Sequence, residues 1–274
     1  MRMSAIPAGF ECEERAGAIT AVRVDLVAGA RALGLFERDG IARAFAAGEA
    51  VGGGRVPAAL IAWPSGPHEI VVRRLRHGGV LGGVLGGAYL GASRVLRELA
   101  VNAELFAAGA PVPQPALVLA RRSAGPFWAC AIGTERVAGA NFASSLLGAE
   151  RERALRAAAI AVRSFHDAGG RHADLNATNL LLAERNGHLT ATVIDLDRAR
   201  VRAPVPAKRR MREIARLWRS LLKRGAGAAL SPAERDAFLV AYCAGEAPLE
   251  RELRARLRRE QLRSALHTWR YPRR

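Results

Sequence analysis

The stretch HADLNATN, residues 172–179, decides the fold class, together with VIDLD at residues 193–197. It has the spacing H-x-D-x-x-x-x-N, and Asp195 comes directly after an apolar run. Carboxylate side chains can act as general bases, and carboxylate and amide oxygens are ligands for magnesium. Asp174, Asn179 and Asp195 are therefore candidate functional residues.

Each of these residues also has an ordinary structural interpretation. Asp174 could cap a helix, Asn179 could lie in a turn, and Asp195 could end a strand. These interpretations do not account for the Asp-to-Asn spacing or for the preceding His172, so we interpret the three residues as one site. His172 is better explained as a packed histidine that fixes the loop than as a proton carrier. Asp197 either contacts metal or pairs with a neighbouring arginine.

Hydrophobic patterning predicts that the first part of the chain is rich in strands. Apolar runs at residues 54–63 and 69–75 flank the turn sequence Pro-Ser-Gly-Pro, which indicates an antiparallel hairpin. Further strands are predicted at residues 116–120 and 128–132. A helix is predicted from residue 93, between the hairpin and these further strands, by apolar residues spaced three and four apart. The predicted buried face of that helix consists of Leu96, Leu99, Ala103 and Phe106.

The second part of the chain is predicted to be mainly helical. Helices are expected at residues 150–167 and 208–222, where apolar side chains recur on one face. Between them, strands at 180–182 and 189–194 flank Asn186-Gly187, which is a strong hairpin signal. The expected buried faces are Leu155, Ala159, Val162 and His166 in the first helix, and Met211, Ile214, Trp218 and Leu221 in the second.

The two motifs resemble the catalytic loop and metal-binding segment of protein-kinase-like phosphotransferases. That resemblance implies an α+β, two-lobed, protein-kinase-like fold. An N-lobe of antiparallel strands with one helix is expected at residues 1–134, a hinge at 135–139, and a mainly helical C-lobe at 140–274. The cofactors implied are ATP and Mg²⁺. In phosphoryl transfer a carboxylate orients the acceptor hydroxyl and takes its proton, and oxygen ligands hold magnesium against the nucleotide phosphates. The resemblance therefore implies that Asp174 is the catalytic base and that Asn179 and Asp195 are the metal ligands.

The same resemblance directs attention to nucleotide-binding residues in the first part. Gly52 and Gly54 could let backbone N–H groups approach the phosphates, although a plain flexible loop is nearly as good an explanation. Most members of the superfamily pair a strand lysine with a helix glutamate to hold the α and β phosphates. Here Arg73 occupies the place of the lysine, and Glu98 is positioned to pair with it. Because a planar guanidinium is not equivalent to an ammonium, this departure argues against a generic protein kinase.

Four stretches together resemble the 3-deoxy-D-manno-octulosonic acid (Kdo) kinases. The lipopolysaccharide core heptose kinases share the same plan. The resemblance implies transfer of the ATP γ-phosphate to Kdo, at the expected 4-hydroxyl, on a Kdo-bearing lipid A precursor. It also implies a peripheral protein at the cytoplasmic face of the bacterial inner membrane. The stretches are VVRRLRHGG (71–79), SRVLRELAVNAELFAAGAPVPQP (93–115), HADLNATNLLL (172–182) and VIDLDRAR (193–200).

Net charge supports an anionic partner. The formal charge is +17, and residues 198–224 carry eleven lysines or arginines against one acidic residue. Such a field attracts an anionic membrane surface, a phosphorylated or carboxylated substrate, or nucleic acid, and a merely solvated basic face is an alternative. Nucleic acid is not expected, because no recognition motif accompanies the charge. The start of the chain lacks an apolar segment typical of a signal peptide, so a cytoplasmic location is expected.

Other functions remain open from the sequence. One alternative is a heptose kinase or another kinase-like phosphotransferase. A comparison of acceptor sugars would distinguish these enzymes from a Kdo kinase. A second is a catalytically silent, kinase-like scaffold that binds lipid. The presence of Asp174, Asn179 and Asp195 together argues against the scaffold, and the missing lysine is the only feature that favours it. The sequence does not indicate an oligomeric state.

Overall fold

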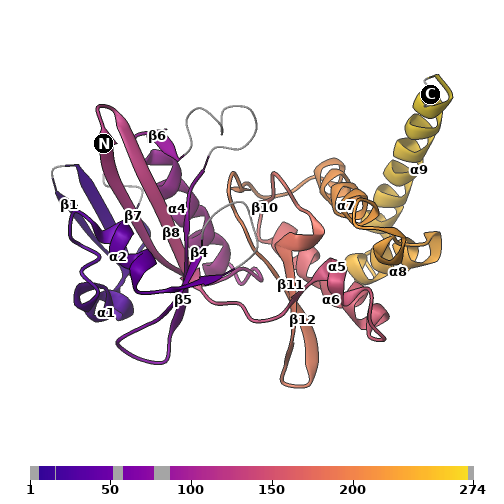
Figure 1. Cartoon of the computed structure of the whole chain (residues 1–274). Helices are drawn as coiled ribbons and strands as arrows, with labels where there is room; N and C mark the ends of the chain where they lie inside the picture. Colours follow the sequence, from indigo (N-terminus) through magenta and orange to yellow (C-terminus); the bar gives the residue numbers. More distant parts are fainter. Residues whose placement is uncertain (1–5, 16, 52–57, 77–86, 271–274) are drawn as a thin grey trace. The chain divides into compact units, whose positions relative to one another are not determined.

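The computed structural model of the chain divides into two compact units. Unit 1 comprises Met1–Ala107 with Pro113–Val137, and unit 2 comprises Ala108–Val112 with Ala138–Arg274. Each unit has its own core and is described by itself (Figure 1). The residues that the structure describes are 6–15, 17–51, 58–76 and 87–270, with side chains described as far as residue 259 except at position 226.

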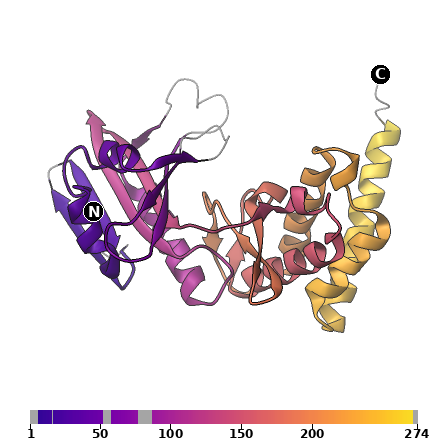
Figure 2. The same ribbon diagram turned by 60° about the horizontal axis from the view of Figure 1, so that its bottom comes forward.

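Unit 1 is built on an antiparallel sheet, seen from two directions in Figures 1 and 2. The strand order is β1-β2-β7-β8-β5-β4-β3, and β6 pairs with β8 beside this path. The strands are β1 (Phe10–Arg15), β2 (Ala18–Arg23), β3 (Glu49–Val51), β4 (Ala58–Ala62), β5 (Glu69–Arg74), β6 (Ala88–Leu90), β7 (Pro115–Ala124) and β8 (Phe127–Glu135).

The hairpin predicted at residues 54–75 is confirmed as β4 and β5, which lie toward one edge of the sheet. Ala58 lies opposite Arg73 and Ala62 opposite Glu69 in the antiparallel register. Gly66 in the connecting turn has a φ of +93°, which a glycine adopts without the steric cost that a Cβ would add. The hairpin thereby fixes Arg73 near the end of β5, opposite Ile132 of β8.

Both faces of the sheet are buried, and β7 shows how. Leu117 and Leu119 belong to one apolar cluster, whereas Val118 and Ala120 belong to another. Because successive side chains of a strand point to opposite faces, the alternation places one cluster on each side of the sheet. The first cluster includes residues from the segment η2 (Val24–Leu26), α1 (Val27–Ala32) and α2 (Gly40–Ala46).

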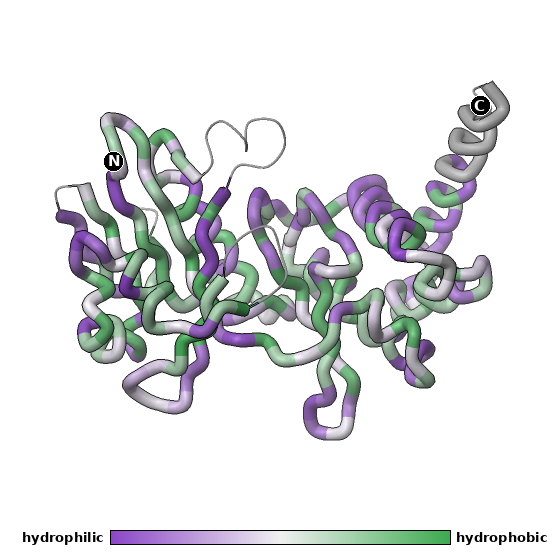
Figure 3. The backbone as a smooth tube through the Cα atoms, in the orientation of Figure 1, coloured by the Kyte–Doolittle hydropathy of each residue, from purple (hydrophilic) through white to green (hydrophobic). Residues whose placement is uncertain are grey.

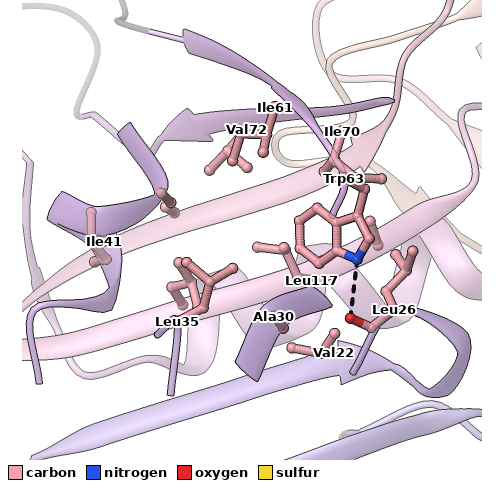
Figure 4. Close-up of a cluster of buried hydrophobic side chains, with 14 of the residues drawn as sticks. Val22, Leu26, Ala30, Leu35, Ile41, Ile61, Trp63, Ile70, Val72 and Leu117 are labelled. Atoms are coloured by element: carbon pink, nitrogen blue, oxygen red, sulfur yellow. Dashed lines mark hydrogen bonds between the residues drawn. The ribbon is translucent and has the colours of Figure 1, made fainter. Parts of the chain in front are cut away.

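Trp63 is the largest member of that first cluster, and Figure 4 shows it among the aliphatic side chains. Its indole Nε1–H donates to the carbonyl oxygen of Leu26 at 3.1 Å. Buried tryptophans usually find a hydrogen-bond partner for this N–H. This bond ties the end of the β4 strand region to the start of α1.

The second cluster is covered by α4 (Ser93–Ala107), the longest helix among the described residues of unit 1 and the helix predicted from residue 93. Its buried side chains include Leu96 and Leu99, as predicted. The prediction that Phe106 also lies on this buried face is wrong, because Phe106 is 40% exposed. In the last turn of α4 it is Leu105 that is buried. The short helices α1 and α2 were not predicted.

Unit 2 is mainly helical, with two-stranded and three-stranded sheets. The helix α6 packs against α8 and β12, and α7 packs against α9. Its helices are α5 (Phe142–Ser145), α6 (Arg151–Asp167), α7 (Ala207–Leu222), α8 (Pro232–Cys243) and α9 (Ala247–Arg270), with 3-10 turns η3 (Ala177–Asn179) and η4 (Ala226–Ala228). Its strands are β9 (Ala140–Asn141), β10 (Gly170–Arg171), β11 (Leu180–Arg185), β12 (His188–Val193) and β13 (Arg200–Val201).

The predicted amphipathic helices of this unit are confirmed as α6 and α7. All eight apolar or aromatic positions expected to face inward are buried. Figure 3 shows hydrophilic and hydrophobic residues alternating along α7. The predicted hairpin is β11 and β12, whose turn residues Asn186 and Gly187 have φ values of 50° and 76°. Two left-handed turn residues in succession match the twist of the paired strands.

The fold class predicted from the sequence is therefore confirmed. Unit 1 is an antiparallel sheet with one long helix, and unit 2 is helical with a small hairpin at the predicted motif. Within the described residues, none of the helices combines the length and apolar character that crossing a bilayer requires.

Trp63→Phe tests the packing of unit 1. The ring is kept, but the carbonyl of Leu26 loses its donor, so the free energy of unfolding should fall by about 1–3 kcal/mol. Urea unfolding measures the loss. The control is Trp128→Phe, because Trp128 is only partly buried on β8. An equal loss in both variants would contradict the role assigned to the hydrogen bond.

Candidate functional site

His172 opens the loop that carries the predicted site, and its ring is only 1% exposed. Its Nδ1 lies 3.1 Å from the backbone N of Asp174, and its Nε2 lies 3.2 Å from the carbonyl oxygen of Ile194. Because an amide N–H only donates and a carbonyl only accepts, Nε2 carries the proton and Nδ1 accepts. His172 thus fixes the backbone at Asp174 and ties the loop to the segment after β12.

Asn176 organises the next turn of the loop. Its Oδ1 accepts from the backbone N–H of Thr178 at 2.9 Å, which caps η3. Its Nδ2 donates to Asp174 Oδ2 at 3.1 Å. The carboxylate of Asp174 is thereby oriented while the residue stays exposed. A base that must meet an external hydroxyl needs both properties.

Asn179 connects the two motifs. Its Nδ2 donates to the carbonyl oxygen of Asp174 at 3.0 Å, and its own carbonyl accepts from the N–H of Ile194 at 2.9 Å. Asp195 is the next residue after Ile194 and has a φ of 58°, in the left-handed region that non-glycine residues rarely adopt. The structure therefore brings the loop with Asp174 and Asn179 against the segment with Asp195, all within unit 2.

The oxygen atoms of this arrangement fit a magnesium ion bound together with a nucleotide. Asn179 uses its Nδ2 in the loop, and no hydrogen-bond donor of the described residues engages its Oδ1. Asp195 adds an exposed carboxylate. Among the described residues, no group of three or more His, Cys, Asp or Glu side chains forms a metal cage. Magnesium in nucleotide sites takes one or two protein oxygens and completes its shell with phosphates and water.

The helix α7 supports the loop through a row of polar side chains. Each contacts a different part of the loop backbone, so the loop is held along its length. The bonds run from the His172 N–H to Glu213 Oε2 (2.8 Å), from Arg216 Nη1 to the Ala173 carbonyl (2.6 Å), and from the Ala177 N–H to Ser220 Oγ (2.9 Å).

Sequence reasoning missed these supporting residues. Glu213, Arg216 and Ser220 follow one another at intervals of three and four, so they form a single stripe on α7. Glu213 and Ser220 are buried in spite of their polarity. A polar stripe at helical spacing beside an apolar face is the signal that could have revealed them. Nothing in the sequence alone shows what such a stripe faces.

Glu213 is also the centre of a buried network. His166 Nε2 donates to its Oε2 at 3.3 Å, and His166 Nδ1 accepts from the Tyr242 hydroxyl at 2.7 Å. Arg210 Nη1 donates to the same hydroxyl oxygen at 3.1 Å. The network joins α6, α7 and α8 beneath the catalytic loop.

Burial sets the protonation of this network. It lowers the pKa of His166, more strongly than the hydrogen bond to Glu213 raises it. Burial alone would raise the pKa of Glu213, but bonds from His166 and the His172 N–H, with the charge of Arg209 nearby, hold it below the ordinary value. We therefore describe the pair as a neutral imidazole donating to an ionised carboxylate.

Unit 1 contains the other predicted site residues. Arg73 Nη2 donates to Glu98 Oε1, so the predicted pair between β5 and α4 is present. The Glu98 side chain is 5% exposed and that of Arg73 is 26% exposed. The carboxylate therefore anchors a guanidinium that still reaches solvent. Gly52 and Gly54 lie outside the residues that the structure describes.

These features define the class of the protein. A strand-rich unit with an Arg-Glu pair, and a helical unit with the loop-and-strand motif at residues 172–195, are those of the protein-kinase-like fold. The model of the lipopolysaccharide kinase (Kdo/WaaP) family matches residues 65–242, and the chain belongs to this family.

Relatives agree with this assignment. A 3-deoxy-D-manno-octulosonic acid kinase of Xylella fastidiosa (strain 9a5c) is 34% identical over 158 residues, which is 56% of this chain and 61% of that protein. The enzyme of the same name from Stenotrophomonas maltophilia (strain R551-3) is 36% identical over 176 residues, 62% of this chain and 68% of that protein. The chain thus spans somewhat less than two thirds of the first relative.

One solved structure is similar over much of its length. A structure described as WaaP in complex with acyl carrier protein has a TM-score of 0.48 and 20% sequence identity. The match covers 77% of this chain and 88% of that one.

The His166 network predicts a pH dependence of stability. The unfolded chain takes up a proton near the ordinary histidine pKa of 6.5, whereas buried His166, with its lowered pKa, does not. Stability should therefore fall as the pH drops below about 6.5, by at most about 1.4 kcal/mol per pH unit for one proton. Urea unfolding between about pH 7.5 and 5 measures this slope.

His166→Gln should give a shallower slope, because the buried titrating group is gone. His188→Gln is the matched control, since His188 is exposed on β12 and should leave the slope unchanged. If His166→Gln kept the full slope, the dependence would belong to other groups.

Proposed function

We propose that the chain is an ATP-dependent and magnesium-dependent kinase that phosphorylates the Kdo sugar of a Kdo-bearing lipid A precursor. The expected acceptor is the 4-hydroxyl. One observation carries the proposal: Asn179 bonds both to Asp174 and to the residue before Asp195, so a candidate base and two candidate metal ligands form one unit. Membership in the lipopolysaccharide kinase family and the names of its relatives support the choice of substrate.

Asp174 is the base in this proposal. Asn176 holds one carboxylate oxygen, Oδ2, so the group has a defined direction. The acceptor hydroxyl donates a hydrogen bond to the carboxylate and gives up its proton as its oxygen bonds to the γ-phosphorus. The bond from that phosphorus to the oxygen of ADP breaks in the same step. Positioning, rather than covalent chemistry, is what such a transfer asks of the protein.

Asn179 and Asp195 are the proposed metal ligands. Magnesium, when bound, supplies positive charge against the nucleotide phosphate oxygens. The task of the protein is to keep two oxygen ligands in place. Asn179 does so through the hydrogen bonds at both its side chain and its backbone, and Asp195 through the link of Ile194 to His172 and Asn179.

Arg73 is the proposed contact for the nucleotide phosphates. Glu98 restrains its guanidinium, as a glutamate restrains the lysine in other members of the superfamily. A guanidinium offers a planar fork of donors that suits two phosphate oxygens at once. The role of Gly52 and Gly54 in covering the phosphates remains a prediction, as does a hinge at residues 135–139.

The acceptor implies a location. A Kdo-bearing lipid A precursor is a membrane lipid, so we propose that the chain works as a peripheral protein at the cytoplasmic face of the inner membrane. The net charge of +17 favours an anionic surface and an anionic substrate.

The direct experiment incubates the protein with ATP, magnesium and a Kdo-bearing lipid A precursor, followed by mass spectrometry of the lipid. One added phosphate on Kdo is the expected result, and fragmentation identifies the hydroxyl. Magnesium-ATP binding without transfer would redirect the assignment to heptose or other acceptors. Absence of nucleotide binding would favour a silent lipid-binding scaffold.

Asp174→Asn should lower the turnover number by about 10²–10⁴, because it removes the proton acceptor and keeps the shape of the side chain. Nucleotide binding, measured by calorimetry on the same preparation, should stay close to wild type. Unchanged turnover would rule out Asp174 as the base.

Asp195→Asn should weaken magnesium-nucleotide binding and raise the magnesium concentration needed for half-maximal rate, by about tenfold or more for the loss of a charged ligand. Asparagine also tolerates the left-handed backbone at this position, where alanine would add strain. Glu184→Gln removes an exposed carboxylate from β11 and is the control. A normal magnesium dependence in Asp195→Asn would exclude this ligand.

A further inference from the structure

A basic cavity of about 570 Å³ lies within unit 2, and no ligand has been assigned to it above. Its lining also includes Ala173, the neighbour of Asp174, so the cavity borders the loop with the proposed base. Six cationic side chains line it: Arg171, Arg198, Arg200, Lys208, Arg209 and Arg212.

The pair of strands β10 and β13, together with the start of α7, brings five of these six cations together from separate parts of the sequence. The strand β10 precedes the catalytic loop and pairs with β13, which places Arg171 directly opposite Arg200. The first turns of α7 add Lys208, Arg209 and Arg212. The cavity therefore depends on the tertiary structure, because its cations come from segments that are separate in the sequence.

Little negative charge compensates these cations. Arg209 Nε lies 2.9 Å from Glu213 Oε1, and Arg171 Nη2 donates to two backbone carbonyls. In the part of the chain that the structure describes, Arg198, Arg200, Lys208 and Arg212 form no ion pair. The first turn of α7 contains no acidic residue, so the positive end of the helix dipole adds to the field.

Some arginines elsewhere in unit 2 are paired with two acidic partners each. Examples are Arg153 with Glu150 and Glu184, Arg163 with Asp167 and Glu246, and Arg254 with Asp236 and Glu250. The cavity gathers six cations, of which Arg209 alone has an acidic partner among the described residues, and repulsion among them is relieved by an oxyanion.

We propose that the basic cavity binds oxyanion groups, phosphate or carboxylate, of the acceptor glycolipid. The inference rests on the proposed function, and it assigns the acceptor side of the site. Arginine and lysine form charge-assisted hydrogen bonds with such groups. Because the cavity borders the loop of Asp174, binding there restrains the acceptor sugar next to the base.

The test compares two double variants of the whole chain that lose equal charge. Arg200→Gln/Arg212→Gln removes two cations from the cavity. Arg185→Gln/Arg219→Gln removes two exposed arginines of unit 2 that do not line it. The acceptor is presented in neutral detergent micelles, so that no anionic bilayer contributes to binding.

The cavity double variant should raise the KM for the Kdo-bearing acceptor by about tenfold or more, because it loses two charge-assisted contacts. Its kcat and its KM for ATP should stay within about twofold of wild type, a split that a folding defect would not produce. The control double variant should match wild type. Equal effects in the two variants, or no effect in either, would overturn the inference.

A measurement of acceptor binding to variants that also carry Asp174→Asn tests this inference separately from the proposed function. Affinity for the acceptor should fall with the cavity double variant and not with the control, with no turnover required. Absence of transfer by wild type would reject the proposed function, whereas acceptor affinity unaffected by the cavity variant would reject the acceptor site alone. Calorimetry with inorganic phosphate tests whether the cavity binds free phosphate instead of the glycolipid. If phosphate bound tightly in the cavity and did not change the affinity for the acceptor, the inference would also be overturned.

Discussion

The buried carboxylate of Glu213 is the constraint on which unit 2 depends. It is 1% exposed, yet it stays ionised because it accepts from His166 and from the His172 N–H and lies beside Arg209. An ionised group can be buried only when such partners are in place. The helices α6 and α7 must therefore meet in one register, and that register sets the start of the catalytic loop. The remaining order of the loop, through Asn176 and Asn179, follows from this anchor.

Local pattern was enough to predict much of the fold. The helices α4, α6 and α7 follow from the spacing of apolar residues, and the hairpin β11–β12 from Asn186-Gly187, because each depends on a short stretch of chain. The motif around Asp174 could be found because its spacing reflects the chemistry. The pairing of Arg73 with Glu98 was also predicted and is present, whereas the catalytic, phosphate-binding and metal-binding roles remain proposals.

The buried network around Glu213 and the basic cavity could not be predicted from local pattern, because both depend on residues that are distant in the sequence. Glu213 meets residues 41 and 47 positions earlier in the chain, and no local periodicity encodes such a meeting. The basic cavity likewise exists only once β10 pairs with β13. The short helices α1 and α2 hold too few residues for a clear period.

The arginine at position 73 has a consequence for chemical labelling. Reagents that acylate the phosphate-side amine of kinases need a lysine on the strand equivalent to β5. Unit 1 contains no lysine, and the only two in the chain, Lys208 and Lys223, belong to unit 2. Amine-directed profiling built around that strand position would therefore pass over this protein.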